Sequence, residues 1–368
     1  MTDVTDDEAY FLWLSRAAGL NSRKALAVMR ALPDIGEAFG APRGIFKNIE
    51  GLTDQNIHNI ISSRDMENIS NYKRELEAEG ITFVTINDPS YPSLLKEIYD
   101  PPACFYMLGD MPGDALPTVS VIGSRRCSEY GLTVSRKLSR DLARYGVVTV
   151  SGMAKGIDSS AHRGALDSGG KTVAVLGCGV DICYPSENKI LRGQIIKNGC
   201  VISEYPPGTK PIPYNFPMRN RIISGLSLAT VVVEAAEKSG TLITAGQALE
   251  QGREVFAVPG NITSKLSRGT NGLLKQGAAL IESAEDILNL LGVEGNVIDD
   301  AKKISGGGYA ELKPEEKVVY DLIGQEPCGA AEIIYKTNSQ TQTVQYILTM
   351  LEIYGLVRKL PGQRYIRS

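Results

Sequence analysis

The sequence predicts an α/β protein built on a doubly wound parallel sheet, with one small domain before it and another after it. Three observations lead to this prediction. Helical spacing fills residues 5 to about 80, short apolar runs alternate with helical patterns from about 116, and three helical patterns with an alternating pair close the chain. We therefore expect an extended Rossmann-like sheet, an N-terminal small helical domain and a C-terminal winged helix.

The first 85 residues are predicted to form the helical domain. The stretches "AYFLWLSRAAGL", "RKALAVMRALPDIGEAF" and "DMENISNYKRELEAEG" are amphipathic, and Gly, Pro and Asn separate them. Since they hold no cluster of titratable side chains, a packing or interaction module (SAM/HhH-like) over 1–85 is favoured. Residues 86–115 are rich in proline and turn signals, which predicts an ordered connector.

The central domain is expected over residues 116–292. Its strand candidates share a continuous apolar character and alternate with helical segments. They are "TVSVIGS", "VVTVSG", "KTVAVLG", "GCVISEY", "LATVVVEAA" and "REVFAVPG". Such runs indicate a parallel sheet covered by helices on both faces, and a sheet of this kind binds ligands at the carboxyl ends of its strands.

The C-terminal part is predicted to be a linker and a winged helix. Residues 293–312 are polar and glycine-rich, which is typical of a flexible linker. Residues 313–368 give three helical patterns and end in an alternating pair around Pro361 and Gly362, as in a winged helix-turn-helix.

Composition narrows the classes of function. The net charge is −3, so the chain lacks the overall basic character of many DNA-binding domains, although a local patch is enough to bind phosphate. Six cysteines without CxxC pairs and only two histidines argue against a metal site. No apolar run reaches the ~18 residues of a membrane span, and we expect a cytoplasmic protein.

Two nucleotide-binding motifs fail on inspection. After the first predicted strand, Arg125 occupies the place where a GxGxxG fingerprint needs its second glycine. The stretch "ALDSGGKT" resembles a relaxed P-loop, but there a helix runs into a strand, the reverse of the P-loop order. We therefore expect no nucleotide cofactor.

A third stretch, residues 234–252, predicts an anion cradle without catalytic chemistry. A strand ends near Glu234, and a helix begins at the turn formed by Ser239, Gly240 and Thr241, which leaves free backbone N–H groups at the sheet edge. The turn resembles the phosphate-binding turn of nucleoside-monophosphate phosphoribohydrolases. Thr244 stands where those enzymes carry their catalytic glutamate.

No catalytic set can be assembled from the remaining residues. Asp158 and His162 are four apart on a predicted helix, but a helix cap and a hydrogen-bonded histidine are favoured over an acid–base pair. No Ser-His-Asp set, Cys-His set or paired-carboxylate site can be assembled from the sequence. We expect the protein not to be an enzyme.

Loops at the carboxyl edge of the predicted sheet share cations, glycines or amides. Arg125 and Arg126 follow the first strand, Lys155 follows the second, and Lys189 follows the third. Since these strand ends meet at one edge, an anion bound there would be held from several sides.

The stretch "NFPMRNRIISGLS" raises a separate question, because it joins two arginines to an apolar run. Arginine cannot lose its charge, so Arg219 and Arg221 need an anion or a carboxylate. Phosphates of a nucleic acid would satisfy them, and the rings of Phe216 and Tyr184 would stack on bases at about 1–3 kcal/mol each.

Simpler interpretations stay open. Arg219 and Arg221 could instead form ion pairs with Glu204 or Glu234, and Arg125 could be an ordinary surface charge. The sequence alone does not decide between these roles.

Seven motifs in order resemble those of the bacterial DNA-processing protein A (DprA/Smf) family over about residues 80 to 285. They are "YPSLLKEIYDPPACFYMLGD", "VIGSRRCSEYG", "SGMAKGIDSSAH", "VLGCGVDICYP", "NFPMRNRIISGLS", "KSGTLITAGQALEQGREVFAVPG" and "GTNGLLKQGA". The resemblance identifies the expected anion as single-stranded DNA. It implies a homodimeric recombination mediator that protects incoming strands and loads the RecA recombinase during natural transformation, the uptake of DNA by competent cells.

Motif by motif, the resemblance and the loops together give one expected DNA-binding set. Its members are Gly123, Ser124, Arg125, Ser151, Gly152, Lys155, Lys189, Phe216, Arg219, Asn220, Arg221, Ser239, Gly240 and Thr241. Dimer and RecA contacts cannot be located by a motif.

Two other functions remain as alternatives. One is a nucleotide phosphoribohydrolase-like enzyme on the same fold. The other is a regulator whose winged helix binds duplex DNA, for which Arg358, Lys359, Arg364 and Arg367 are available. Acidic residues nearly balance the basic ones in that domain, so a protein contact is slightly favoured there.

Overall fold

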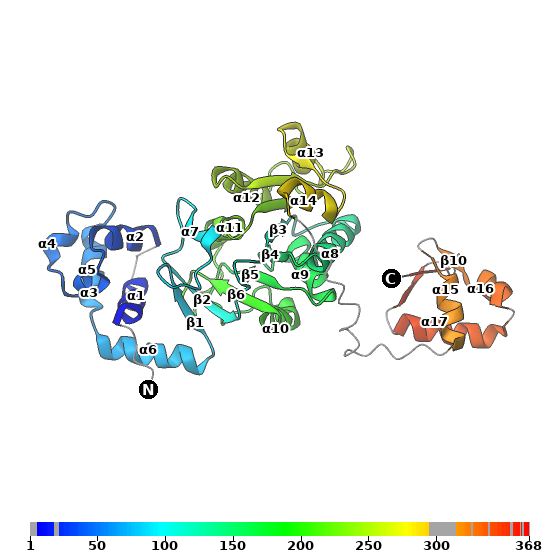
Figure 1. Cartoon of the computed structure of the whole chain (residues 1–368), viewed down its shortest axis with the longest axis horizontal. Coiled ribbons are helices and arrows are strands. Elements are labelled where there is room, and N and C mark those ends of the chain that lie inside the picture. The colour runs from blue at the N-terminus through cyan, green and yellow to red at the C-terminus, as the bar shows by residue number, and fades with distance from the viewer. Residues whose placement is uncertain are drawn as a thin grey trace. The chain divides into compact units, whose positions relative to one another are not determined.

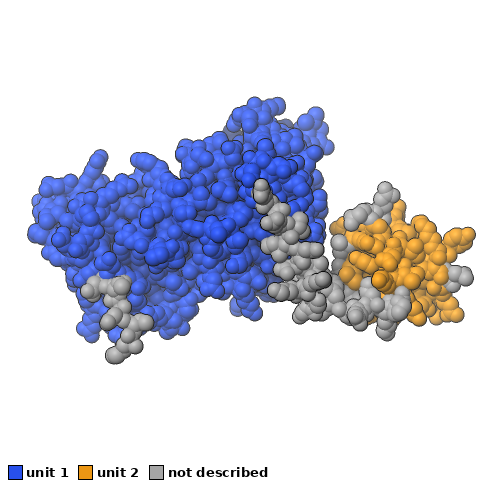
Figure 2. Space-filling view, viewed as in Figure 1, with its two compact units in different colours: residues 1–298 blue, residues 299–368 orange. Residues whose placement is uncertain are grey.

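The computed structural model describes residues 6–17, 22–293, 314–324, 327–337, 339–353, 356–360, 362 and 364–367. The chain divides into two compact units, residues 1–298 and 299–368 (Figure 2). Each unit has its own hydrophobic core, and each is described by itself.

Unit 1 begins with a layer of helices. They are α1 (Asp6–Arg16), α2 (Ser22–Ala31), α3 (Ile35–Gly40), α4 (Arg43–Phe46), α5 (Asp54–Ser62) and α6 (Met66–Ala78). Side-chain caps at Asp34, Thr53 and Asp65 begin three of them, as expected where backbone N–H groups lack partners. The buried rings of Trp13 and Phe46 fill the core of this layer. Figure 1 shows the layer beside the β1 edge of the sheet.

Among the described residues, unit 1 holds a nine-stranded sheet of order β1-β2-β6-β5-β4-β3-β7-β8-β9. The strands are β1 (Thr82–Thr85), β2 (Cys104–Gly109), β3 (Thr118–Ile122), β4 (Val148–Ser151), β5 (Thr172–Val175), β6 (Gly199–Ser203), β7 (Ala229–Val232), β8 (Glu254–Ala257) and β9 (Ala279–Leu280). β2 pairs antiparallel with β1 and β6, and every other neighbouring pair is parallel.

Helices cover both faces of this sheet (Figure 1). The helical elements of the rest of unit 1 are α7 (Ser93–Lys96), α8 (Glu129–Arg144), α9 (Ile157–Asp167), η1 (Ser186–Asn188), α10 (Lys189–Lys197), α11 (Asn215–Gly225), α12 (Gly240–Glu250), α13 (Arg268–Lys275) and α14 (Ala284–Leu291). On β3, Val119 and Val121 pack with α8 and α9, whereas Ile122 joins the core beneath α11 and α12. Burial on both faces explains the continuous apolar runs and confirms the predicted fold class.

The expected connector, residues 86–115, contains a strand of the sheet. Cys104–Gly109 forms β2, which pairs with β1 on one side and with β6 on the other. It thereby joins β1 to the parallel part of the sheet. The proline-rich flanks, with Pro101 and Pro102 shortly before it, concealed this strand in the sequence pattern.

Strand order reverses at β3, which pairs with β4 on one side and with β7 on the other. β4, β5 and β6 extend one way and β7, β8 and β9 the other. In an open α/β sheet the carboxyl ends of strands at such a reversal leave a crevice, and ligands bind there.

Unit 2 is a winged helix, as predicted. Its elements are α15 (Pro314–Leu322), β10 (Cys328–Gly329), α16 (Ala330–Thr337), α17 (Thr341–Ile353), β11 (Val357–Leu360) and β12 (Arg364–Arg367), with sheet order β10-β12-β11. The linker expected over 293–312 lies, apart from Val293, outside the described residues. No helix in the described part of the chain has the length and apolarity needed to cross a membrane.

Candidate functional site

A cleft of about 690 Å³ lies at the reversal of strand order, beyond the ends of β3 and β7. Three segments supply most of its wall: the loop after β3, the N-terminal half of α11, and the turn before α12. Predicted residues that line it are Gly123, Ser124, Arg125, Phe216, Arg219, Asn220, Ser239, Gly240 and Thr241.

A buried carboxylate fixes the loop after β3. Glu234 accepts hydrogen bonds from the Ser128 backbone N–H at 2.9 Å and from its hydroxyl at 2.6 Å. The Glu234 carbonyl accepts from the Ser124 N–H at 2.8 Å. Ser128 also caps α8 by accepting from the Gly131 N–H, as predicted. Glu234 thus holds the loop and does not pair with Arg219 or Arg221 among the described contacts.

Close packing against α9 explains the glycine in this loop. A Cβ on Gly123 would lie 2.6 Å from the Ile157 side chain, so only glycine lets the loop run this near the helix. The next residues, Ser124 and Arg125, then turn into the cleft.

Aromatic and cationic side chains stack on one wall. The rings of Tyr184 and Phe216 are 5.5 Å apart at an interplanar angle of 37°. The exposed Arg125 guanidinium lies 5.1 Å from the Phe216 ring centroid, within cation–π range. This wall presents flat π surfaces beside a positive charge.

Arg219 lies under the cleft, with 4% of its surface exposed. Its guanidinium donates to the carbonyl of Gly152 at 2.9 Å and to that of Val175, at the ends of β4 and β5. Burial lowers the pKa of Arg219 to about 10, and the neighbouring Asp158 carboxylate opposes this shift. Even so, the side chain stays protonated at neutral pH and brings a positive charge to the cleft floor.

The third wall is a helix N-terminus. Ser239 caps α12: its hydroxyl oxygen accepts from the Thr241 N–H at 3.2 Å. The first amide groups of α12 therefore lie at the cleft, where a helix end favours an anion. Thr244 also belongs to the lining, and it offers a hydroxyl group where the hydrolases carry a carboxyl group.

Five predicted residues do not line the cleft. Ser151 is buried and donates to the Val121 carbonyl at 2.7 Å, and the exposed Lys155 is ion-paired with Glu187. Lys189 begins α10 on the surface beyond the lining. Gly152 serves the site indirectly, because a Cβ there would lie 2.4 Å from Arg219.

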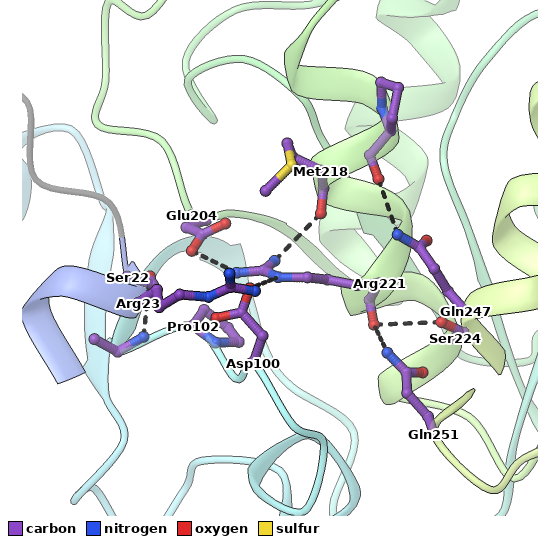
Figure 3. A network of polar contacts seen from close by, with 12 residues as sticks. Ser22, Arg23, Asp100, Pro102, Glu204, Met218, Arg221, Ser224, Gln247 and Gln251 are labelled. Atoms are coloured by element: carbon purple, nitrogen blue, oxygen red, sulfur yellow. Dashed lines mark hydrogen bonds and ion pairs between the residues drawn. The ribbon is translucent and has the colours of Figure 1, made fainter. Parts of the chain in front are cut away.

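Arg221 is the fifth, and its expected role as a DNA contact needs correction. Its side chain is 8% exposed, does not belong to the cleft lining, and points from α11 toward Glu204 and Asp100 (Figure 3). It pairs with Glu204 at 2.7 Å and with Asp100 at 3.3 Å. The ion-pair alternative with Glu204 is therefore the observed one.

Asp158 and His162 do not form an acid–base pair. His162 Nδ1 lies 2.7 Å from the Thr172 hydroxyl, which itself donates to the Thr149 carbonyl. Burial lowers the pKa of His162 to about 3, so this imidazole is neutral at neutral pH.

The expected DNA-binding set leaves out two cations of the cleft, although Arg126 was expected at this edge of the sheet. Arg126 and Lys238 both belong to its lining, and both are exposed. Their positions gave the signal: Arg126 follows Arg125, and Lys238 directly precedes the helix cap Ser239. Among the described residues, no group of three or more His, Cys, Asp or Glu side chains could hold a metal ion.

Comparison with known proteins fits this geometry. The sequence pattern of DNA recombination-mediator protein A matches residues 82–292, and that of the DprA winged helix domain matches 308–363. This chain belongs to the DprA/Smf family. The predicted resemblance is thereby confirmed, and the family is one of recombination mediators.

Relatives of the family cover different shares of the chain. Protein Smf of Synechocystis is 34% identical over 99% of this chain and 100% of its own length. DNA processing protein DprA of Streptococcus pneumoniae is 46% identical over 204 residues, 55% of this chain and 72% of the relative.

Two solved structures are similar as well. The X-ray structure of DNA processing protein A from Streptococcus pneumoniae has a TM-score of 0.67 and 38% identity, and covers 76% of this chain and 97% of that one. DNA processing protein A from Helicobacter pylori, described for its single-stranded DNA binding mode, has a TM-score of 0.51 and 32% identity, and covers 57% and 95%.

Proposed function

We propose that this protein binds single-stranded DNA in the cleft and serves as a recombination mediator in natural transformation. One observation carries the proposal: the cleft joins cations and a helix N-terminus, which suit phosphates, to the stacked rings of Tyr184 and Phe216, which suit unpaired bases. Bases in a duplex are already stacked, so such rings favour single strands. The single-stranded DNA binding of the Helicobacter pylori relative supports the same ligand.

Each wall is assigned one part of the nucleotide. Arg125, with Arg126 and Lys238, would neutralise phosphates at the rim. The amides of Ser239, Gly240 and Thr241 would hold a phosphate at the α12 terminus. Phe216 would stack on a base while Asn220 hydrogen-bonds to its edge, and Arg219 would contribute charge from below.

The remaining parts of the proposal rest on family membership. We propose that the protein acts as a homodimer in the cytoplasm, protects incoming strands and passes them to RecA, without catalysing a reaction itself. Thr244 at the position of a hydrolase's glutamate argues against the enzymatic alternative. Release of free base from nucleoside monophosphates by the purified protein would restore that alternative.

Fluorescence anisotropy tests the ligand. Labelled oligo-dT and its duplex counterpart are titrated with the protein across a salt series. We expect binding that prefers the single strand, with a salt slope of about −0.7 per phosphate contact. Arg125→Ala should weaken it about tenfold, the scale of one lost charge-assisted hydrogen bond.

Lys197→Ala is the matched control, because Lys197 is an exposed cation at the end of α10, on the opposite edge of the sheet. It should bind like the unmodified protein. Equal or stronger binding of the duplex would move the activity to the winged helix, where Arg358, Lys359 and Arg364 are exposed. Equal losses in Arg125→Ala and Lys197→Ala would mean that only overall charge matters.

A further inference from the structure

Helix α11 separates two cavities of unit 1. Its cleft side presents Phe216 and Asn220 to the DNA cleft. Its other side presents Met218 and Arg221 to a second cavity of about 480 Å³, between the N-terminal helices and the sheet. Residues two apart on a helix point about 200° apart, which is why Arg219 and Arg221 serve opposite sides.

Arg221 is held in the second cavity by a dense polar network (Figure 3). Its Nη2 donates to Glu204 Oε1 at 2.7 Å, its Nε to Asp100 Oδ2 at 3.3 Å, and its Nη1 to the Met218 carbonyl at 3.3 Å. The side chains of Arg221, Asp100 and Glu204 are only 8%, 15% and 14% exposed. A charge buried to this extent is costly without an oppositely charged partner, so these ion pairs are expected to persist in the folded protein.

The same network ties α11 to its neighbours. Asp100 also pairs with Arg23 of α2 at 3.4 Å. At the other end, the Arg221 carbonyl accepts from Gln251 Nε2, just after α12, at 2.9 Å. Arg221 therefore links the N-terminal helices, α11 and the helix whose first turn faces the cleft.

We propose that Arg221 is a positioning residue for DNA binding: its ion pairs with Glu204 and Asp100 fix the rotation of α11 that turns Phe216 and Asn220 into the cleft. The inference rests on the proposed function, since it concerns the same cleft. Without the pairs, the buried guanidinium would draw its helix toward water, and the stacking wall would turn with it.

The sign of one substitution separates positioning from direct attraction. Glu204→Gln removes a negative charge from the protein, which by electrostatics alone would strengthen binding to DNA. Positioning requires the opposite result, because the strongest partner of Arg221 is lost. We expect Glu204→Gln to bind oligo-dT about tenfold more weakly, measured at a temperature where circular dichroism shows every variant folded.

Glu187→Gln is the matched control. It also removes one carboxylate from the segment that follows a parallel strand, but Glu187, in η1, is 60% exposed and pairs with Lys155 on the surface. This variant should bind as tightly as the unmodified protein or more tightly. A folded Glu204→Gln that does the same would overturn the positioning role of Arg221.

Asp100→Asn is the milder second variant if Glu204→Gln does not fold, because it leaves the Glu204 pair in place. Weaker binding by a folded Asp100→Asn supports positioning, and unchanged or tighter binding refutes it. The unmodified protein and Arg125→Ala are measured beside both. Absence of single-strand binding in the unmodified protein would refute the proposed function. Loss in Arg125→Ala but not in the network variants would refute only the present inference.

Discussion

At the scale of single residues, Arg219 shows how a buried guanidinium is held under a cleft. Its guanidinium donates hydrogen bonds to the carbonyls of Gly152 and Val175, at the ends of β4 and β5. Carbonyl oxygens at those strand ends would repel a phosphate, and Arg219 offsets them. The guanidinium is thereby held in place under the cleft, beside the Asp158 carboxylate that also belongs to the lining.

His162 carries a prediction about pH. Thr172 gives its hydroxyl hydrogen to Thr149, so His162 Nδ1 must be the donor in its bond to Thr172. Nε2 is buried and lacks a hydrogen-bond partner among the described residues, and a proton there would be unsatisfied. This agrees with a pKa lowered by burial from 6.5 to about 3.

Below pH 6.5 the unfolded chain binds a proton at His162 and the folded chain does not. The free energy of unfolding therefore decreases as the pH is lowered through that range. The contribution is fully present above 6.5 and is lost as pH falls toward 3, by about 2 kcal/mol between pH 7 and pH 5. Urea unfolding of the unmodified protein at pH 7 and pH 5 should show this decrease in the free energy of unfolding. In His162→Gln the decrease between the two pH values should be smaller by about 2 kcal/mol. His58→Gln, at the other, exposed histidine, should keep the full loss. Identical pH dependence in His162→Gln and the unmodified protein would contradict the assignment.

The arginines also mark where residue-level prediction stops. The sequence predicted an anion or a carboxylate for both Arg219 and Arg221. Arg221 pairs with two carboxylates, whereas Arg219 donates to two backbone carbonyls. The partners of Arg221 are 17 and 121 residues away in the chain, and only the folded sheet brings them together. Arg125 and Ser239 were simpler, because their positions depend on the strand or helix directly beside them.

At the scale of elements, glycines show which helices are packed closely. Gly164 of α9 faces α8, and a Cβ there would lie 2.2 Å from the Arg136 carbonyl oxygen. Gly193 lies in the middle of α10, where an added Cβ would have nothing within 4 Å.

The two glycines should therefore respond oppositely to alanine. Gly164→Ala forces the two helices apart and should lower the free energy of unfolding by about 1–3 kcal/mol. Gly193→Ala only restricts the unfolded chain and should raise it by about 0.5–1 kcal/mol. Chemical denaturation of both variants decides the point. A stable Gly164→Ala would mean that α8 and α9 are not in close contact.

The prediction of helices and strands succeeded where a sequence pattern has a single structural explanation. Continuous apolar runs predicted the parallel strands, and Ser128 was correctly expected to cap α8. It failed at β2, whose six residues lie close after two prolines in a stretch rich in turn signals. The pairing partners of β2 are β1 and β6, both antiparallel, so β2 does not belong to the alternation of strand and helix that indicates the parallel strands.

At the scale of the whole molecule, the two units have separate cores. Unit 2 packs its own cluster around Val344, Leu348 and Leu351. We expect calorimetry of the full chain to show one unfolding transition for each unit. Deletion of residues 299–368 should remove one transition and leave the other Tm unchanged. A drop of more than about 3 °C, about 1 kcal/mol in a unit of this size, would mean that the units stabilise each other.

The order of the strands has a consequence for biosynthesis. β3 lies in the interior of the sheet, yet its partner β7 leaves the ribosome only after residues 123–228 have been made. At about 5–20 residues per second, that delay is on the order of 5–20 s. Throughout this delay the β7 side of β3 has no strand partner and exposes a row of unpaired backbone groups to other nascent chains. The last wall of the cleft begins at Ser239 and is made after the same delay. A nascent chain that stops before Ser239 therefore has no complete cleft.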